Sequence, residues 1–320
     1  MVADPLRISI VTPSPRSSRA GNRVTALRWA GLLRQLGHRP ELTDRWRDQA
    51  CDVLVTVHAE KSAAAVLAAR AARPALPIVT LLSGTDIYPD FAPNAETLAA
   101  LDAADALLAL QRRAVDALPE QLRDRARTMT QSATAAHAAR APGFQVCVLA
   151  HLRPVKAPLL AVQAVTALPR DLPVTLVLAG ERLDEAYSDE VLAAVEQEPR
   201  VTWRGALDRR SSKALLAEST ACLVPSRAEG GANVVSEAIA ADTPVLCSAI
   251  PGNLGLLGAD WPGAFADGDV AACAALLQRA ATDAAFVDDL CARTAQLQPM
   301  VAPARERAAW ATLLAELVAR

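Results

Sequence analysis

The sequence predicts an α/β protein of two similar domains, each a parallel sheet covered by helices on both faces. Two observations lead to this fold class. Fully apolar runs alternate with helical patterns along most of the chain, which is typical of parallel strands buried on both faces. The alternation breaks near residues 134–143 and then starts again. With 320 residues, the chain is long enough for two domains of ordinary size.

The first half contains four apolar runs and two helical patterns. The expected strands span residues 7–12, 52–58, 77–83 and 105–110, and the expected helices span 25–37 and 62–72. The runs are short and rich in Val, Ile and Leu, as buried strands of a parallel sheet are.

The interruption at residues 134–143 marks the expected domain boundary. Periodicity is lost there, and Pro142 and Gly143 interrupt regular structure. We therefore predict an N-terminal domain at 1–140, a C-terminal domain at 141–303 and a separate final helix at 304–320.

The second half repeats the alternation of the first. The expected strands span 146–151, 174–179, 201–204, 222–225 and 244–248. The expected helices span 157–167, 189–197, 232–240, 269–282, 283–296 and 304–319. Two such domains in series would face a central cleft, because parallel sheets bind ligands at the carboxyl ends of their strands.

Composition excludes several classes of protein. The formal net charge is −2, which argues against non-specific electrostatic binding to nucleic acid or membrane. No apolar stretch reaches the ~18 residues of a membrane span, and Met1–Pro5 lacks the layout of a signal peptide. The six cysteines show no metal-ligand spacing and mostly lie in apolar runs, as reduced buried thiols do. We expect a cytoplasmic protein whose partners are small-molecule substrates, with a homodimer as one candidate oligomeric state.

A basic loop follows the first strand where a dinucleotide-binding or kinase motif would lie. The chain has no GxGxxG after that strand and no GxxxxGK[ST] anywhere, which argues against a dehydrogenase or a kinase. The loop instead offers three arginines and two small residues at the start of a helix, namely Arg16, Arg19, Gly21, Asn22 and Arg23. Backbone N–H groups and guanidinium groups together favour an anion. The alternative is a solvated loop with an Asn cap.

The strongest motif lies between residues 225 and 238. Glu229 and Glu237 are separated by seven residues, and the segment follows a strand and opens a helix. Carboxylates accept hydrogen bonds from sugar hydroxyls. Gly230 and Gly231 allow close approach of the backbone to a ligand, and the helix N-terminus favours a phosphate. The alternative is a surface salt-bridge pair on an ordinary helix.

Two cations follow the first strand of the second domain. Arg153 and Lys156 are three residues apart, at the expected carboxyl end of that strand. Arg153 can fork onto phosphate oxygens, and Lys156 supplies a compact charge, so the pair suits a diphosphate. A solvated turn is the alternative.

These motifs resemble those of the retaining, family 4-like glycosyltransferases of the GT-B fold, which has two Rossmann-like domains facing a central cleft. Glu229 and Glu237 match the family's E-x7-E motif, and Arg153 and Lys156 match its R-x-x-K motif. The resemblance implies that the two cations hold the diphosphate of a nucleotide sugar. It also implies that Glu237 binds the ribose, that Glu229 contacts the sugar, and that the base packs near Gly205. The last helix would cross back onto the first domain.

A narrower resemblance covers nearly the whole chain. The sequence is similar to the selenosugar synthases of selenoneine biosynthesis in the strings GNRVTALRWAGLLRQLGH (21–38), DVLVTVHAEKSAAAV (52–66), GTDIY (84–88), EGGANVVSEAI (229–239) and PGNLGLLG (251–258). This resemblance implies that the anomeric carbon of a UDP-sugar, UDP-GlcNAc or UDP-glucose, is joined to the selenium of selenophosphate.

The glutamate motif departs from the generic family pattern at one place. Many family 4 members have an aromatic residue after the first glycine, whereas this chain has Gly231, Ala232 and Asn233. The usual acceptor packing is therefore absent. The change leaves room and a polar Asn233, which fits an unusual acceptor.

Selenophosphate is a small, charged and already nucleophilic anion, so it needs cations and N–H groups more than a general base. The basic loop at residues 16–23 supplies such groups, and Lys61 and Asp86 follow other strands of the first domain. His58 ends a strand and is a catalytic candidate together with Arg153, Lys156 and Glu229. A structural role at the end of its strand is the alternative for His58, and a helix cap is the alternative for Asp86.

No cofactor or metal is expected. Asp267-Gly268-Asp269 spells D-x-D, by which another glycosyltransferase fold holds a divalent metal, but Asp269 is placed to cap the following helix. Two alternatives to the selenium reaction stay open. One is a conventional GT-B glycosyltransferase with a hydroxyl acceptor, and the other is a non-catalytic protein that binds nucleotide sugars.

Overall fold

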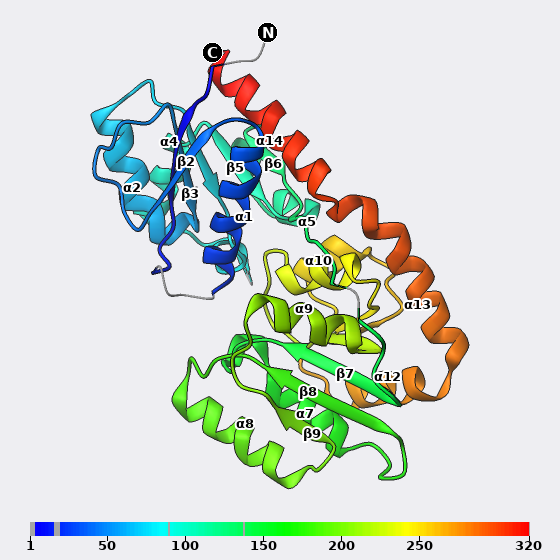
Figure 1. The fold of residues 1–320 in the computed structure, drawn as a ribbon. Coiled ribbons are helices and arrows are strands. Elements are labelled where there is room, and N and C mark those ends of the chain that lie inside the picture. Colours follow the sequence, from blue (N-terminus) through cyan, green and yellow to red (C-terminus); the bar gives the residue numbers. More distant parts are fainter. Residues whose placement is uncertain (1–3, 16–19, 89, 137, 320) are drawn as a thin grey trace. The chain divides into compact units, whose positions relative to one another are not determined.

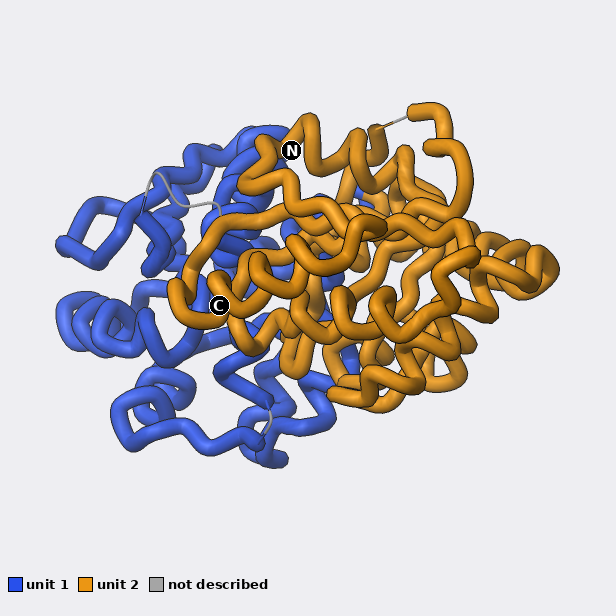
Figure 2. The backbone as a smooth tube through the Cα atoms, turned by 90° about the horizontal axis from the view of Figure 1, so that it is seen from below, with its two compact units in different colours: residues 1–131, 303–320 blue, residues 132–302 orange. Residues whose placement is uncertain are grey.

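The computed structural model describes residues 4–15, 20–88, 90–136 and 138–319. The chain forms two compact units, one made of residues 1–131 with 303–320 and the other of residues 132–302 (Figure 2). The first boundary therefore falls before the predicted position of 140/141. Segment 132–143 is bonded to unit 2, because Ala133 donates its N–H to Val301 O (3.0 Å) and Arg140 Nη2 donates to Asp242 O (2.7 Å).

Unit 1 contains a six-stranded sheet in the order β2-β1-β3-β4-β5-β6, and each neighbouring pair is parallel. Its strands are β1 (Arg7–Val11), β2 (Arg39–Thr43), β3 (Val53–Val57), β4 (Ile78–Leu81), β5 (Ala106–Ala109) and β6 (Ala126–Thr128). Its helices are α1 (Gly21–Gln35), α2 (Ala59–Ala72), α3 (Gly84–Ile87), α4 (Ala95–Ala103), α5 (Arg112–Asp116), α6 (Glu120–Arg123) and α14 (Pro303–Val318).

The sheet of unit 1 is covered on both faces (Figure 1). Ile8 and Ile10 of β1 pack in a cluster with α1 and α14, whereas Val11 and Leu54 pack in a second cluster with α2 and α4. Alternation of side chains along the strands sends them to the two faces. This explains why the strands read as continuous apolar runs in the sequence.

Helix α14 is anchored on α1 by aromatic and charged side chains. The rings of Trp29 and Trp310 meet edge to face with centroids 5.0 Å apart. The side chain of Glu306 is fully buried; it accepts hydrogen bonds from Trp29 Nε1 (2.7 Å) and Arg28 Nε (3.1 Å). The last helix thus belongs to unit 1 although unit 2 precedes it in the chain.

Unit 2 contains a second six-stranded parallel sheet, in the order β12-β11-β10-β7-β8-β9. Its strands are β7 (Phe144–Leu149), β8 (Val174–Ala179), β9 (Val201–Trp203), β10 (Ala221–Val224), β11 (Val245–Ser248) and β12 (Ala264–Phe265). Its helices are α7 (Pro158–Thr166), α8 (Glu185–Gln197), α9 (Arg209–Glu218), α10 (Asn233–Ala240), α11 (Pro251–Leu257), α12 (Val270–Thr282) and α13 (Ala284–Leu297). The short 3₁₀ helices η1 (Pro154–Lys156) and η2 (Gln298–Val301) complete it.

The structure adds elements that the sequence pattern did not reveal. Strand β2 lies at the edge of its sheet, and Pro40 is its one fully buried residue, so it lacks an apolar run. Helix α9 is rich in charged and Ser residues. Helix α1 begins at Gly21, earlier than the predicted Thr25.

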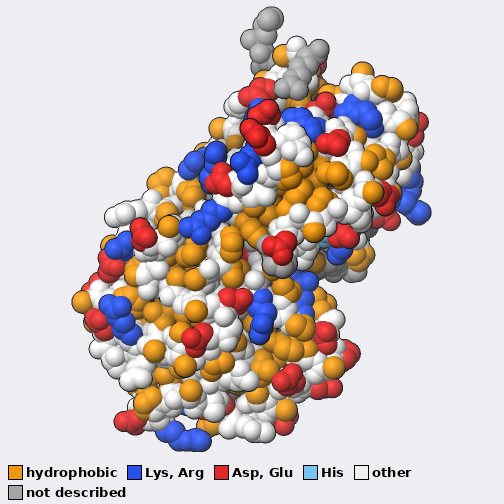
Figure 3. All heavy atoms as spheres, turned by 180° about the vertical axis from the view of Figure 1, so that it is seen from behind, with side chains coloured by type: hydrophobic (Ala, Val, Ile, Leu, Met, Phe, Trp, Pro, Cys, Tyr) orange, Lys and Arg blue, Asp and Glu red, His pale blue; other side chains and the backbone are white. Residues whose placement is uncertain are grey.

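The surface carries mixed charge on the face drawn in Figure 3, where basic and acidic side chains are interspersed. Among the described residues, no single helix is long and apolar enough to cross a membrane. A bent pair of segments, 270–282 and 284–318 at 99°, reaches that length and composition only when taken together.

Candidate functional site

The order of strands reverses in unit 2 at β7. Strand β7 lies between β10 and β8, so successive connections leave it in opposite directions. Such a reversal opens a crevice at the carboxyl ends of the strands, where α/β sheets bind ligands. The loop after β7 carries Arg153 and Lys156, and the loop after β10 carries Glu229. The two strongest sequence motifs therefore lie at the carboxyl ends of neighbouring strands of the same sheet.

Lys156 and Glu229 are in direct contact at this edge of the sheet. Lys156 Nζ donates a hydrogen bond to Glu229 Oε1, and the two side chains are 19% and 9% exposed. A backbone hydrogen bond from Arg227 N–H to Val155 O (2.9 Å) holds the two loops together. The structure thus joins a cation and a carboxylate that the sequence assigned to neighbouring parts of one ligand.

Helix α11 packs directly against the backbone of the Glu229 loop. A Cβ atom at Gly252 would lie 1.9 Å from Glu229 O, so only glycine allows this close approach. Ser248 Oγ donates to Ser226 O, and Asn253 Nδ2 donates to Ser248 O (3.1 Å). These buried side chains fix the loop between β10 and α10, and neither motif analysis nor spacing indicated them.

Helix α10 begins at Asn233, immediately after Gly230, Gly231 and Ala232, which are all buried. Asn233 and Glu237 lie four residues apart on the half-buried side of the helix. Glu237 is therefore in the second turn of α10. The backbone N–H groups of a first turn have no intrahelical acceptors and favour an anionic ligand.

Lys213 of α9 is a charged residue near Glu237 that sequence reasoning missed. Burial and then the charge of Arg209 lower the pKa of Lys213, and the charge of Glu237 opposes them. Lys213 Nζ donates a hydrogen bond to Thr134 Oγ1 (2.5 Å). No motif marked this lysine, because its position depends on how α9 packs beside α10.

The remaining predicted donor residues lie at the same edge of the sheet. Arg153 is exposed and directly precedes η1. Gly205 follows β9 with φ of +68°, a backbone conformation that favours glycine, and its carbonyl accepts a hydrogen bond from Gly180 N–H (2.9 Å). Ala157 also has positive φ (46°), which is uncommon for a residue other than glycine, where the Lys156 loop turns into α7.

In unit 1, His58 and Asp86 form a buried pair. Nδ1 of His58 lies 2.8 Å from Asp86 Oδ1, and its Nε2 lies 3.2 Å from Thr85 Oγ1. The backbone of His58 has φ of +75°, and its carbonyl accepts the N–H of Ser62 (3.1 Å). The side chain is 3% exposed, so these contacts support the structural alternative for His58.

The carboxylate of Asp86 is fully engaged. It accepts hydrogen bonds from the N–H groups of Ala59 (2.9 Å), Glu60 (3.0 Å) and Ser83 (2.7 Å), the last as part of a capping box. Burial raises the pKa of Asp86, but the hydrogen bond from His58 and those from the backbone outweigh it and hold the pKa below its ordinary value. Asp86 therefore ties two loops together, and its capping box and its 1% exposed side chain support the alternative of a helix cap.

The other acceptor candidates begin α1 and α2. Gly21, Asn22 and Arg23 are the first three residues of α1, whose cap is Ala20 and not Asn22. Within the described part of the chain, Arg23 Nε is buried without a hydrogen-bond partner. Lys61 is exposed on α2. Arg16 and Arg19 lie outside the described residues.

The D-x-D string has a structural role, as the sequence indicated. Asp269 caps α12, because its side chain accepts the N–H of Ala272 (2.8 Å). In the ranges that the structure describes, no group of three or more His, Cys, Asp or Glu residues is placed to hold a metal ion.

Comparison with known families defines the class of this protein. The family model of Glycosyl transferases group 1 matches residues 131–296, and the chain belongs to this family. The match covers the residues of unit 2 described above, including Arg153, Lys156, Glu229 and Glu237.

Solved structures confirm the GT-B fold over nearly the whole chain. Sucrose-phosphate synthase from Thermosynechococcus elongatus superposes with a TM-score of 0.83 at 16% identity, covering 98% of this chain and 99% of its own. HepE (Alr3699) of Anabaena, in complex with UDP and glucose, gives 0.76 at 15% identity, covering 97% and 100%. A glycosyltransferase from Rickettsia africae ESF-5 gives 0.78 at 12% identity, covering 98% and 99%.

Proposed function

We propose that this glycosyltransferase joins the sugar of a UDP-sugar to the selenium of selenophosphate and so forms a selenosugar. The observation that carries the donor half is the contact of Lys156 with Glu229 at the strand-order reversal of unit 2. The reaction breaks the bond between the sugar and the diphosphate. A cation that binds the diphosphate and a carboxylate that contacts the sugar would therefore lie next to each other.

The donor is assigned to unit 2. Arg153 and Lys156 hold the diphosphate together with the N–H groups at the start of α10, and Glu229 contacts the sugar. Glu237 binds the ribose, and Gly205 leaves room for the base. HepE, which has the same fold, was solved with UDP-glucose as well as with UDP, and this supports a UDP-sugar as donor.

The acceptor is assigned to unit 1. The start of α1, with Gly21, Asn22 and Arg23, combines backbone N–H groups with a guanidinium group, and this combination suits a small anion. Arg16 and Arg19 belong to the same proposal by sequence. The selenium assignment itself rests on the strings shared with the selenosugar synthases.

The reaction breaks the bond between the anomeric carbon and the UDP oxygen and forms a carbon–selenium bond. Selenium supplies the electron pair, and UDP leaves with the pair of the broken bond. Water then cleaves the selenium–phosphorus bond, which releases phosphate and the selenosugar. Positive charge from Arg153 and Lys156 stabilises the leaving UDP, so we propose that no metal is needed.

Turnover should therefore persist in excess EDTA. A rate that is restored only by added Mg²⁺ or Mn²⁺ would contradict the proposal that no metal is needed.

The first test is UDP release from UDP-GlcNAc and from UDP-glucose, with and without selenophosphate, followed by mass spectrometry of the product. We expect release that depends on selenophosphate and a product with the mass of a selenosugar. Release that ignores selenophosphate would remove the selenium assignment and direct the search to hydroxyl acceptors. No release with any acceptor, despite donor binding, would favour a binding protein.

Two variants test the donor assignment. Glu237→Ala should weaken binding of the UDP-sugar about tenfold or more, because the ribose hydroxyls lose a charged acceptor. Arg153→Ala should lower turnover about 100-fold by removing a cation from the leaving diphosphate. Arg45→Ala is the control, because Arg45 is exposed and distant in the sequence from both motifs. Unchanged affinity in the first variant, or unchanged turnover in the second, would refute the corresponding role.

A further inference from the structure

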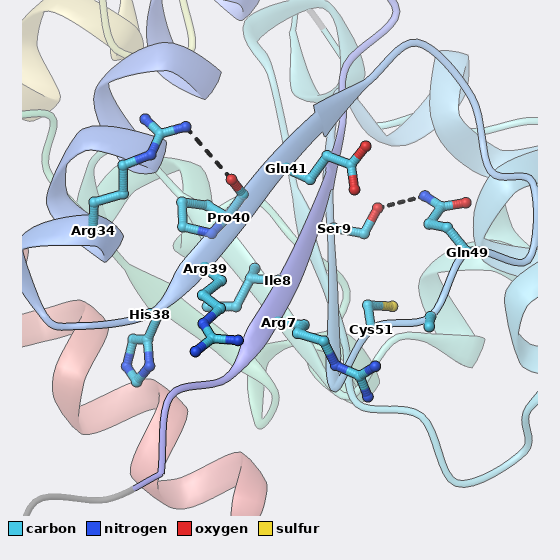
Figure 4. A pocket seen from close by; sticks show the side chains of 11 residues that line it. Arg7, Ile8, Ser9, Arg34, His38, Arg39, Pro40, Glu41, Gln49 and Cys51 are labelled. Carbon is cyan, nitrogen blue, oxygen red and sulfur yellow. Dashed lines mark hydrogen bonds between the residues drawn. The ribbon is translucent and has the colours of Figure 1, made fainter.

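A cavity in unit 1 lies at the opposite end of the strands from the residues discussed above. Its volume is about 510 Å³, and it is lined by the first residues of β1 and β2, Arg7 and Arg39 (Figure 4). All the strands of this sheet are parallel, and the acceptor candidates follow their carboxyl ends. The cavity is therefore at the amino ends, and the proposed reaction does not use it.

Two arginines lie side by side at this cavity. Arg7 and Arg39 are directly opposite in the β1–β2 ladder, on strands about 4.8 Å apart. Like charges opposite each other in a ladder are destabilising. Figure 4 shows both guanidinium groups at the end of the cavity where His38 also lies.

Only one of these two charges is balanced within the described part of the chain. Asp52 contacts Arg7 through both of its carboxylate oxygens, with Arg7 Nη2 2.8 Å from Oδ1 and Nε 3.3 Å from Oδ2. The backbone N–H of Arg7 also donates to Asp52 Oδ2 (2.7 Å). The backbone N–H of Arg39 donates to Leu6 O (2.8 Å), but among the described residues its guanidinium group makes no hydrogen bond or ion pair. A bound anion would supply the missing counter-charge.

The same face of the sheet continues with polar groups. Ser9 and Glu41, each two residues further along its strand, are also opposite in the ladder. Ser9 Oγ accepts a hydrogen bond from Gln49 Nε2 (2.5 Å), and the side chain of Glu41 is exposed beside it (Figure 4). The cavity thus has a cationic end and, next to it, a carboxylate that can accept hydrogen bonds from hydroxyl groups.

We propose that this cavity binds a small phosphate monoester that carries hydroxyl groups. Its phosphate lies against Arg39 and Arg7, because guanidinium groups pair with phosphate oxygens through two parallel hydrogen bonds. Its hydroxyl groups donate to the carboxylate of Glu41. This site is independent of the UDP-sugar site, and the proposal does not rest on the function given above.

The test is calorimetric titration of the full chain with ribose 5-phosphate and with inorganic phosphate at constant ionic strength. Arg39→Gln should raise the Kd for both probes about tenfold or more. Arg45→Gln removes the same charge from an exposed position outside the cavity and should change neither Kd. Binding of the probes that is lost in Arg153→Gln and kept in Arg39→Gln would place them at the diphosphate site of unit 2 and overturn the proposal.

A further variant tests the orientation of the ligand. Glu41→Gln should weaken binding of ribose 5-phosphate while leaving inorganic phosphate bound as well or better, since a negative charge is removed near the phosphate. Equal weakening of both probes would overturn the hydroxyl assignment. Absence of binding to the wild-type chain at millimolar concentrations, or equal affinity in Arg39→Gln, would overturn the site.

Discussion

Gly252 offers a test of the site that removes no functional group. The residue lies at the start of α11, and a Cβ atom placed there would be 1.9 Å from Glu229 O and 2.6 Å from Glu229 C. Real Cβ atoms essentially never approach within 3.0 Å of another heavy atom, so Gly252→Ala must displace the Glu229 backbone or α11 by about 1 Å. The atoms that must move are the backbone O and C of Glu229. Backbone atoms cannot avoid the clash by a change of rotamer, as the end of a flexible side chain can.

The displacement should separate Glu229 from Lys156. A misplacement of about 1 Å can lower turnover about 100-fold, which is about 2.7 kcal/mol of transition-state stabilisation. Overpacking should also reduce the free energy of unfolding by about 1–3 kcal/mol. The assays are kcat/KM for the UDP-sugar and urea unfolding followed by circular dichroism.

Gly31→Ala is the matched control. Gly31 lies inside α1, and nothing is within 4 Å of a Cβ built on it. The same substitution should there leave activity unchanged and stabilise the helix by up to about 1 kcal/mol. If Gly252→Ala folds and keeps kcat/KM within about twofold of the Gly31→Ala value, the packing of α11 does not position Glu229 and the reasoning is wrong.

The other predictions concern buried charges in unit 1. Asp86→Asn should lower the free energy of unfolding at pH 6 by about 2–3 kcal/mol, since backbone N–H donors lose a charged acceptor. Because the folded pKa of Asp86 lies below the unfolded value of about 3.9, this difference is complete above that pH and shrinks as the pH falls through the folded pKa. A difference that does not change with pH would contradict it. Glu306→Ala should cost about 3–5 kcal/mol by leaving Arg28 and Trp29 without their buried partner, whereas Glu316→Ala, exposed on the same helix, should change stability by less than about 0.5 kcal/mol. Equal urea midpoints for these two variants would refute a role for the buried contact.

Sequence patterns were sufficient where local chemistry decides the structure. The strand at Val174–Ala179 has the predicted bounds, because all of its residues except Thr175 are apolar and buried and it lies in the interior of a sheet. Strand β6 (Ala126–Thr128) was missed because it is a short edge strand with only Ala126 buried. The hydrophobic pattern along the sequence does not indicate which strand lies at the edge of a sheet.

The candidate site also has parts that the local sequence predicts and parts that it does not. The segments that carry Arg153, Lys156 and Glu229 were found from their residue types and from the strands that precede them. The contact between Lys156 and Glu229, and the burial of His58 against Asp86, depend on which strands become neighbours. Spacing along the chain contains no information on such pairings.

The route of the chain also affects how the protein can fold during synthesis. Unit 2 is continuous, whereas unit 1 lacks its last helix until unit 2 has been made. Trp29 and Leu33 share a cluster with Trp310, Leu313 and Leu314, which leave the ribosome after residues 132–302 have been added. At about 5–20 residues per second, this delay is roughly 10–30 s. During that interval the apolar residues of unit 1 that pack against Trp310, Leu313 and Leu314 lack this cover.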